Sequence, residues 1–225
     1  MNLSEAFKAT QLGHLLDVPT HYQHSSQLMW YFILRQVETK KINEMWMLVN
    51  GIPMRFSMTE FALITGLDCS TGLDEETLRN ASIGNRLCYK YFGGSTNIYV
   101  HDLKKKLETL EHREDIELDK VRIALVLFPT RVLMGLEYST TIRSDLLGLA
   151  ENICLFDECN WGVEVYKYTL GKMKKDFRAK VKMLKNDKEK KSKLTYTFNG
   201  FVHAFQVRII SNIISLLVYI MLYLY

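Results

Sequence analysis

The sequence has little proline and little cysteine. Three prolines occur in 225 residues, which excludes a long proline-rich linker between domains. Four cysteines are too sparse for a disulfide scaffold. The first twenty residues lack the apolar run of a secretory signal, because charged and polar side chains interrupt them. We therefore expect a reducing compartment.

The composition is that of an ordinary globular protein, with 48% hydrophobic and 24% charged residues. This balance excludes wholesale disorder, and the length suits one domain or at most two small ones. The net charge of +4 is unevenly spread. Residues 167–193 hold twelve basic and three acidic side chains, a net of +9, so the rest of the chain carries −5. A mildly acidic body thus bears one basic segment.

A β-hairpin followed by a helix is the clearest local pattern. Asn50-Gly51 separates the apolar runs 45–49 and 52–56, and this dipeptide favours a tight turn because both residues accept positive φ. Ser57 and Glu60 fit a capping box that begins a helix, and Gly66 fits its end.

Apolar spacing elsewhere predicts helices. The predicted helical segments are 25–38, 74–80, 100–110, 118–136, 142–156 and 166–184. Segment 118–136 is apolar nearly all round, as in the centre of a bundle, and Pro129 should kink or divide it. The predicted fold class is mainly α: one domain, a helical bundle of six to eight helices with one small β-hairpin near residues 45–56.

Seven segments, taken in order, carry a family resemblance. They are Leu12–Leu16, Leu34–Val37, Trp46–Ser57, Glu60–Cys69, Ile123–Phe128, Asn160–Gly162 and Ala204–Val207. Together they resemble the plant family known as the domain of unknown function DUF1985, over residues 10–207. The hairpin with the following "EFALITGL" is the most specific part.

This resemblance implies a mainly helical module of a plant protein. In that family the domain often precedes a cysteine protease domain that acts on SUMO-type modifiers, in genes of transposon origin. No activity is attributed to the domain itself, so the resemblance supplies no site residues. By association, the resemblance implies a nuclear or cytoplasmic location. It also implies that the module spans residues 10–207 and is truncated at its C-terminus.

The tail, residues 208–225, departs from the family pattern after Val207. Residues Ile209–Tyr225 are 17 in number and uncharged, the short limit of a transmembrane helix. The tail is also rich in residues with A/T-rich codons, and Val207-Arg208 can be encoded by a plant splice donor. Three alternatives stay open: a membrane anchor, a translated intron, or the last core helix of a truncated domain.

Catalysis by a cysteine is not favoured by the pattern. His101-Asp102 precedes Cys154 and Cys159 in the order of a SUMO-type protease. However, no glutamine lies shortly before either cysteine to stabilise an oxyanion, and no glycine follows. We interpret both as free thiols, with Cys154 in a stripe typical of the core.

Metal and nucleotide sites are not favoured either. A closed zinc site needs four ligands, whereas His21/His24 and Cys154/Cys159 are each a pair without a second pair. The segment Gly93–Thr96 lacks the spacing and the lysine of a P-loop. We therefore predict no catalytic, metal or cofactor-binding residue, no small-molecule substrate and no enzymatic activity.

The basic segment offers the only candidate contacts. Phosphates or anionic lipid headgroups could meet Lys172, Lys174, Lys175, Arg178, Lys182 and Lys185. The alternative is a solvated outer helix face. We expect a non-catalytic interaction module with an unknown protein partner. The alternatives are a membrane-anchored protein through Ile209–Tyr225 and weak nucleic-acid binding through 167–193.

Overall fold

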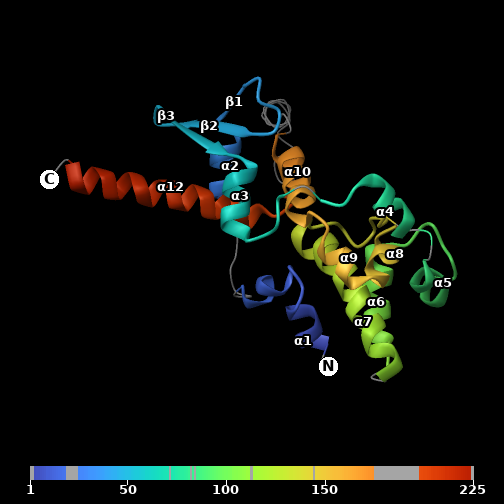
Figure 1. Ribbon diagram of the computed structural model, residues 1–225. Helices are drawn as coiled ribbons and strands as arrows, with labels where there is room; N and C mark the ends of the chain where they lie inside the picture. Colours follow the sequence, from blue (N-terminus) through green and yellow to red (C-terminus); the bar gives the residue numbers. More distant parts are fainter. Residues whose placement is uncertain are drawn as a thin grey trace, which may run out of the picture. The chain divides into compact units, whose positions relative to one another are not determined.

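A computed structural model describes residues 3–18, 25–70, 72–81, 83, 85–111, 114–143, 145–174 and 198–223. The predicted fold class is confirmed, because the chain is mainly helical with one small antiparallel sheet (Figure 1). Its contacts divide it into two compact units. Unit 1 combines residues 1–20 with 67–165, and unit 2 combines 21–66 with 166–225. The boundary between residues 165 and 166 falls inside one helix, α10 (Trp161–Met173).

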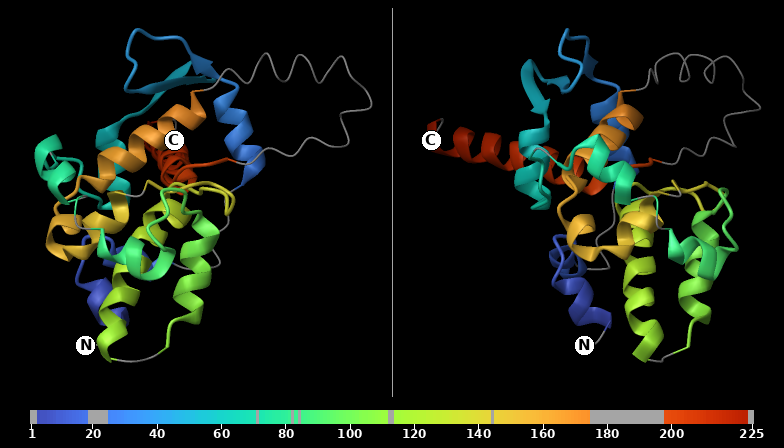
Figure 2. Two further views of the ribbon diagram at one scale, coloured as in Figure 1. Left: turned by 90° about the vertical axis from the view of Figure 1, so that its right-hand side faces the viewer. Right: turned by 45° about the vertical axis from the view of Figure 1, so that its right-hand side comes forward.

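In the described part of unit 1, all the regular elements are helices, and the β-structure is limited to an isolated bridge between Tyr99 and Thr141. Its elements are α1 (Leu3–Lys8), η1 (Gly13–Asp17), α4 (Glu75–Ala81), α5 (Arg86–Phe92), α6 (Val100–Thr109), α7 (Glu114–Leu127), η2 (Phe128–Leu133), α8 (Asp145–Glu151) and α9 (Ile153–Asp157). Helix α7 packs against α1, α6 and α8, and α8 also contacts α4, α5 and α9 (Figure 2). The core of unit 1 therefore lies around α7 and α8.

Pro129 divides the predicted apolar helix, as its missing N–H requires. Helix α7 ends at Leu127 and passes into η2, a π-helical turn with Pro129 near its start. The hydroxyl of Thr130 donates to the carbonyl of Val126 at 2.8 Å. Upstream of the turn, Ile123 is fully buried, in agreement with a central helix.

The prediction of a single helix over 142–156 is wrong. The structure has two short helices, α8 and α9, that are separated at Asn152. The side-chain oxygen of Asn152 accepts the N–H of Leu155 at 3.3 Å and so caps the start of α9. Asn152 lies within the predicted apolar stripe, and its side-chain cap begins a new helix there.

Unit 2 is a small sheet with helices. Its elements are α2 (Ser26–Ile33), β1 (Gln36–Val37), β2 (Met45–Val49), β3 (Ile52–Phe56), α3 (Met58–Thr65), the later part of α10 and α12 (Val202–Tyr223). The strands are antiparallel in the order β1-β2-β3. Among the described elements, α2 contacts β2, and α12 contacts both α3 and β3.

The predicted hairpin and its following helix are confirmed. Asn50 and Gly51 have φ of 50° and 80°, and Val49 pairs with Ile52 across the turn. Ser57 and Glu60 form the capping box, and Gly66 ends α3 with φ 68°.

Strand β1 was missed by the sequence analysis. The predicted helix over 25–38 ends instead at Ile33, and Gln36 and Val37 pair with β2. The side-chain amide of Gln36 also donates to the carbonyl of Met173 at 2.8 Å. This strand forms through contacts with segments distant in the sequence, and a local residue pattern does not reveal such contacts.

Four aromatic side chains form the core of unit 2: Phe56, Phe61, Tyr166 and Phe205. Each is at most 1% exposed. The ring of Phe56 lies 5.2 Å from that of Phe205 and 5.8 Å from that of Tyr166, and Phe61 lies 5.5 Å from Tyr166, between ring centroids. The hydroxyl of Tyr166 donates to the carbonyl of Asn43 at 2.6 Å. These rings join β3, α3, α10 and α12.

Helix α12 runs without interruption through the boundary predicted at Val207. Arg208 donates through Nε to the carbonyl of Arg55 at 3.2 Å and lies 3.7 Å from the carboxylate of Glu60. Ile209 is fully buried. The first part of the predicted tail therefore packs into unit 2. Farther along, α12 extends beyond the sheet and α3 (Figures 1 and 2).

The membrane interpretation of the tail is not supported. Among the residues described, no helix is both long enough and apolar enough to be a candidate membrane span.

Candidate functional site

A buried carboxylate organises one end of unit 1. Asp119 on α7 is 2% exposed and accepts hydrogen bonds from two residues of α5, Arg86 at 2.5 and 3.1 Å and Lys90 at 2.9 Å. The hydroxyl of Tyr91 donates to it at 2.8 Å, and Arg122 donates from the next turn of α7 at 3.0 Å. One carboxylate thereby fixes α5 against α7.

The charge balance of this cluster is positive. Burial raises the pKa of Asp119, but the hydrogen bonds from Arg86, Lys90, Tyr91 and Arg122 outweigh burial and hold that pKa well below its usual value. Arg86 also lies 3.6 Å from Glu151, whose carboxylate accepts the N–H of Leu87 at 2.9 Å. Three cations thus face two carboxylates, and α5 is held at both its start and its end.

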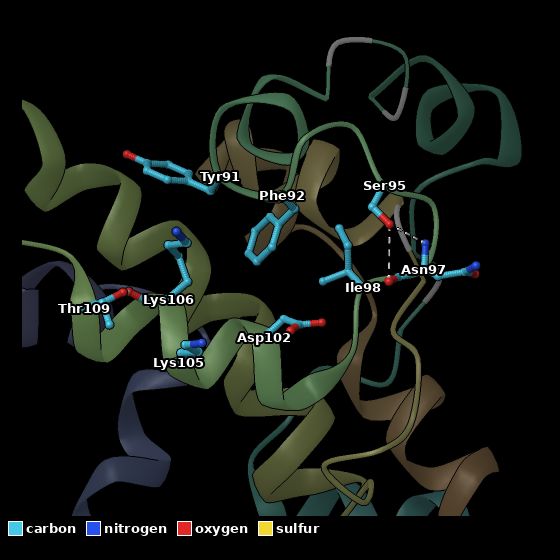
Figure 3. A pocket seen from close by; sticks show the side chains of 9 residues that line it. All are labelled: Tyr91, Phe92, Ser95, Asn97, Ile98, Asp102, Lys105, Lys106 and Thr109. Atoms are coloured by element: carbon cyan, nitrogen blue, oxygen red, sulfur yellow. Dashed lines mark hydrogen bonds between the residues drawn. The ribbon is translucent and has the colours of Figure 1, made fainter.

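A pocket of about 340 Å³ opens between α5 and α6, beside this cluster. It is lined by Tyr91, Phe92, Ser95, Asn97, Ile98, Asp102, Lys105, Lys106 and Thr109. Figure 3 shows Phe92 and Lys106 pointing from facing helices into the space between them. Apolar rings, polar groups and two ammonium groups therefore share one cavity.

The two lysines are the charged groups of the pocket that remain available to a ligand. Asp102 is committed to the start of α6, because its carboxylate accepts the N–H of Tyr99 at 2.9 Å and lies 3.1 Å from the His101 ring. The ammonium of Lys106 lies 5.9 Å from the centre of the Tyr91 ring. Within the described chain, no hydrogen bond or ion pair holds Lys105. The pocket can thus accept a negative charge.

The six predicted basic contacts are only partly described. Lys175, Arg178, Lys182 and Lys185 lie outside the described residues. The ammonium of Lys174 donates to the carbonyls of Lys41 and Ile42, at 3.1 and 2.8 Å, and so holds the loop before β2. That of Lys172 lies 4.9 Å from the centre of the Tyr168 ring. Lys172 and Lys174 thus contact other groups of unit 2.

The candidate catalytic residues are not brought together by the contacts that the structure shows. His101 lies beside Asp102 and the Tyr99 ring, whereas the thiol of Cys159 donates to the carbonyl of Leu155 at 3.4 Å. Cys154 is exposed, so its predicted place in the core is wrong. It is the second residue of the short α9, and only the face carrying Phe156 is buried there.

The two neighbouring thiols should differ strongly in reactivity. Burial, with a smaller effect of Glu164, raises the pKa of Cys159 to about 11, whereas Cys154 is exposed. At pH 8, iodoacetamide should label Cys154 at least ten times faster than Cys159. Peptide mass spectrometry over a time course measures both rates, with urea-unfolded chain as the control in which they converge. Equal rates in the folded chain would contradict the burial of Cys159.

Of the zinc candidates, His21 and His24 lie outside the described residues. In the described ranges, no group of three or more His, Cys, Asp or Glu side chains is placed to hold a metal ion.

The family assignment follows from the sequence match. The model described as "Domain of unknown function (DUF1985)" matches residues 33–172, more than half of the chain. The chain belongs to the DUF1985 family. The DUF1985 match contains the hairpin, the Asp119 cluster and the pocket, whereas α12 lies beyond it. Neither a curated protein nor a solved structure matches the chain.

The pocket of this DUF1985 domain was missed by sequence reasoning. Three consecutive lysines, Lys104 to Lys106, are visible in the sequence, but they read as the outer face of an amphipathic helix. Asp119 is the informative residue, because an acid in the most apolar predicted helix demands buried partners. Three of those partners, Arg86, Lys90 and Tyr91, lie about 30 positions earlier, so spacing alone could not identify them.

Proposed function

We propose that this chain is a non-catalytic protein-interaction module whose α5–α6 pocket binds an acidic segment of a partner protein. The observation that supports it is that Lys105 and Lys106 both line a cavity with an apolar wall. Phe92 and Ile98 supply that wall. A glutamate or aspartate with an apolar neighbour matches this combination.

The expected affinity is modest. Lys105 is exposed and Lys106 is half-buried, so an ion pair with either is screened by solvent and contributes little alone. Two lysines and an aromatic wall acting together should give binding in the micromolar range, strengthened at low salt. The Asp119 cluster adds to this by fixing α5 and by leaving its surroundings positive.

We further propose the biological setting that the family resemblance implies. In that setting the chain is the interaction part of a plant protein of transposon origin, related to proteins that carry a SUMO-type protease domain. The domain would then recruit a partner while catalysis resides elsewhere. The alternative of nucleic-acid binding through 167–193 stays a prediction, because most of that segment lies outside the described residues.

Fluorescence anisotropy with a labelled Glu/Leu decapeptide tests the pocket. The full chain should bind this peptide in the micromolar range and bind its Gln/Leu counterpart at least ten times more weakly. The double variant K105E/K106E should lower the affinity for the acidic peptide at least tenfold, because it replaces both cations of the pocket with anions.

Lys104→Glu combined with Lys8→Glu is the matched control. It makes the same change in net charge, but neither residue lines the pocket: Lys104 lies 3.7 Å from Glu108, and Lys8 lies 3.6 Å from Asp17. This control should bind the acidic peptide within threefold of the parent chain at 150 mM salt. Equal losses in the two double variants, or equal binding of the Glu and Gln peptides, would overturn the proposed site.

A further inference from the structure

Tyr138 lies on the surface of unit 1 beside two cations that come from different elements. It is 41% exposed. The guanidinium carbon of Arg131, on η2, lies 4.5 Å from the centre of its ring, and the ammonium of Lys104, on α6, lies 5.2 Å from that centre. A hydrogen bond from Arg131 and the charge of Lys104 lower the pKa of the Tyr138 hydroxyl, so both cations act on the phenolic oxygen. Two positive groups and a hydroxyl therefore meet at one exposed point, the Tyr138 cluster.

The backbone holds the Tyr138 cluster in place. The N–H of His101, at the start of α6, donates to the carbonyl of Tyr138 at 3.1 Å. Arg131 donates through Nη1 to the carbonyl of Leu136 at 3.2 Å. These bonds tie the loop that follows η2 to α6 on one side and to Arg131 on the other. The cluster is thus formed before any ligand arrives, so binding loses little free energy to the ordering of this loop.

The positive charge of the cluster is not balanced within the chain. In the described part of the sequence, no carboxylate forms an ion pair with Arg131. Lys104 lies 3.7 Å from Glu108, but both side chains are about half exposed or more, so water screens this pair. A guanidinium carries five N–H donors and an ammonium carries three. Because Arg131 spends one of its donors on Leu136, most of this donor capacity is open to a ligand.

We propose that Arg131, Lys104 and the hydroxyl of Tyr138 bind a phosphorylated side chain of a partner protein. A phosphomonoester carries a charge of about −1.5 to −2 at pH 7 and three acceptor oxygens, which matches two cations and a hydroxyl donor. The guanidinium can donate two parallel hydrogen bonds to such a group, and the ammonium adds a point charge. This inference rests on the proposed role as a protein-interaction module, but it does not rest on the α5–α6 pocket.

Other anions match the Tyr138 cluster less well. A single carboxylate carries one charge and would leave one of the two cations unbalanced. A nucleic acid carries one charge on each phosphate and is bound by a groove of cations that follows its backbone, whereas these two cations meet at one ring.

The Tyr138 cluster is also distinct from the pocket, although α6 contributes to both. Successive residues of an α-helix are about 100° apart, so Lys104 lies about 100° from Lys105 and about 200° from Lys106 around α6. Lys105 and Lys106 line the pocket, and Lys104 does not. The two sites can therefore be changed separately.

Amide NMR spectra of the full chain, titrated with an octapeptide of glycine and alanine that carries one phosphoserine, test the site. Saturable shifts should appear in the loop after η2 and at the start of α6. The dissociation constant should be at least ten times lower than that of the peptide with unmodified serine. Tyr138→Phe should raise it about fivefold, because it removes one hydrogen bond and leaves both cations. Arg131→Lys, which keeps the charge and loses the guanidinium fork, should also raise it. Circular dichroism checks that both variants stay folded.

The two double variants K104E/K8E and K105E/K106E separate this site from the pocket, because they change the net charge equally. K104E/K8E should weaken phosphopeptide binding at least tenfold and leave binding of the Glu/Leu peptide within threefold. K105E/K106E should have the opposite effects. If only the Glu/Leu peptide behaves as expected, the phosphate site is wrong and the pocket stands. If only the phosphopeptide does, the pocket is wrong and the phosphate site stands.

Three further results would overturn the phosphate site. One is equal binding of the phosphorylated and unmodified octapeptides, or equal losses of phosphopeptide binding in the two double variants. Another is binding of inorganic phosphate as tight as that of the phosphopeptide, which would assign the Tyr138 cluster to a free anion. The last is tighter and strongly salt-dependent binding of a single-stranded DNA oligonucleotide at the same amides, which would assign the cluster to nucleic acid.

Discussion

Replacing Asp119 by alanine should lower the free energy of unfolding of unit 1 by about 3 kcal/mol. The substitution removes the one acceptor shared by Arg86, Lys90 and Arg122 and leaves their charges close together. Breaking a buried pair from one side costs about 3–5 kcal/mol. We expect the lower end of this range because the side chains of Arg86 and Lys90 are 44% and 42% exposed, so water can solvate their charges once the carboxylate is removed. Hydrogen exchange of α5 and α7, followed by mass spectrometry, measures the loss.

An exposed ion pair of the same unit serves as the control for this substitution. Glu108 lies 3.7 Å from Lys104 on α6, and both side chains are about half exposed or more. Glu108→Ala should therefore cost about 0.5 kcal/mol or less. Similar protection of α5 in the two variants would show that Asp119 does not hold this helix.

The same carboxylate should make the stability of unit 1 depend on pH in the acid range. Asp119 has a pKa in the folded chain that lies well below its unfolded value of about 3.9. A lowered folded pKa stabilises the fold above the unfolded value, and this contribution is lost as the pH falls from about 4 toward the folded pKa. Asp119→Ala should therefore flatten the acid limb of the stability curve.

Local signals explain which parts of the fold could be predicted from the sequence. The turn at Asn50-Gly51 depends on two adjacent residues that tolerate positive φ. The start of α3 depends on Ser57 and Glu60, three positions apart, and Pro129 acts through its own missing N–H. In each case the residues that decide the structure lie within one helical turn of each other.

Long-range contacts explain what could not be predicted. Strand β1 contains only two residues and forms because β2 lies beside it, and no pattern of Gln36-Val37 alone indicates a strand. The pocket exists because Asp119 orients α5 from about 30 residues away. At Asn152 two local signals disagree: the apolar spacing predicts one continuous helix, whereas the asparagine side chain can cap a new one. The structure has the cap.

Replacing Ile209 by alanine should lower the stability of unit 2 by about 2–5 kcal/mol, although the sequence analysis placed this residue outside the domain. Ile209 is fully buried, so the substitution loses transfer free energy and leaves a cavity beside the aromatic core. Leu63→Ala is the control: Leu63 is an apolar residue on α3, the helix that α12 contacts, but it is 81% exposed and should cost under 0.5 kcal/mol.

Hydrogen exchange of β2, β3 and α3 measures both variants. Faster exchange in Ile209→Ala alone would establish that folding of unit 2 requires residues beyond Val207, whatever the origin of the segment that encodes them. Unchanged exchange would return the boundary to Val207 and leave the rest of α12 without a structural role in unit 2.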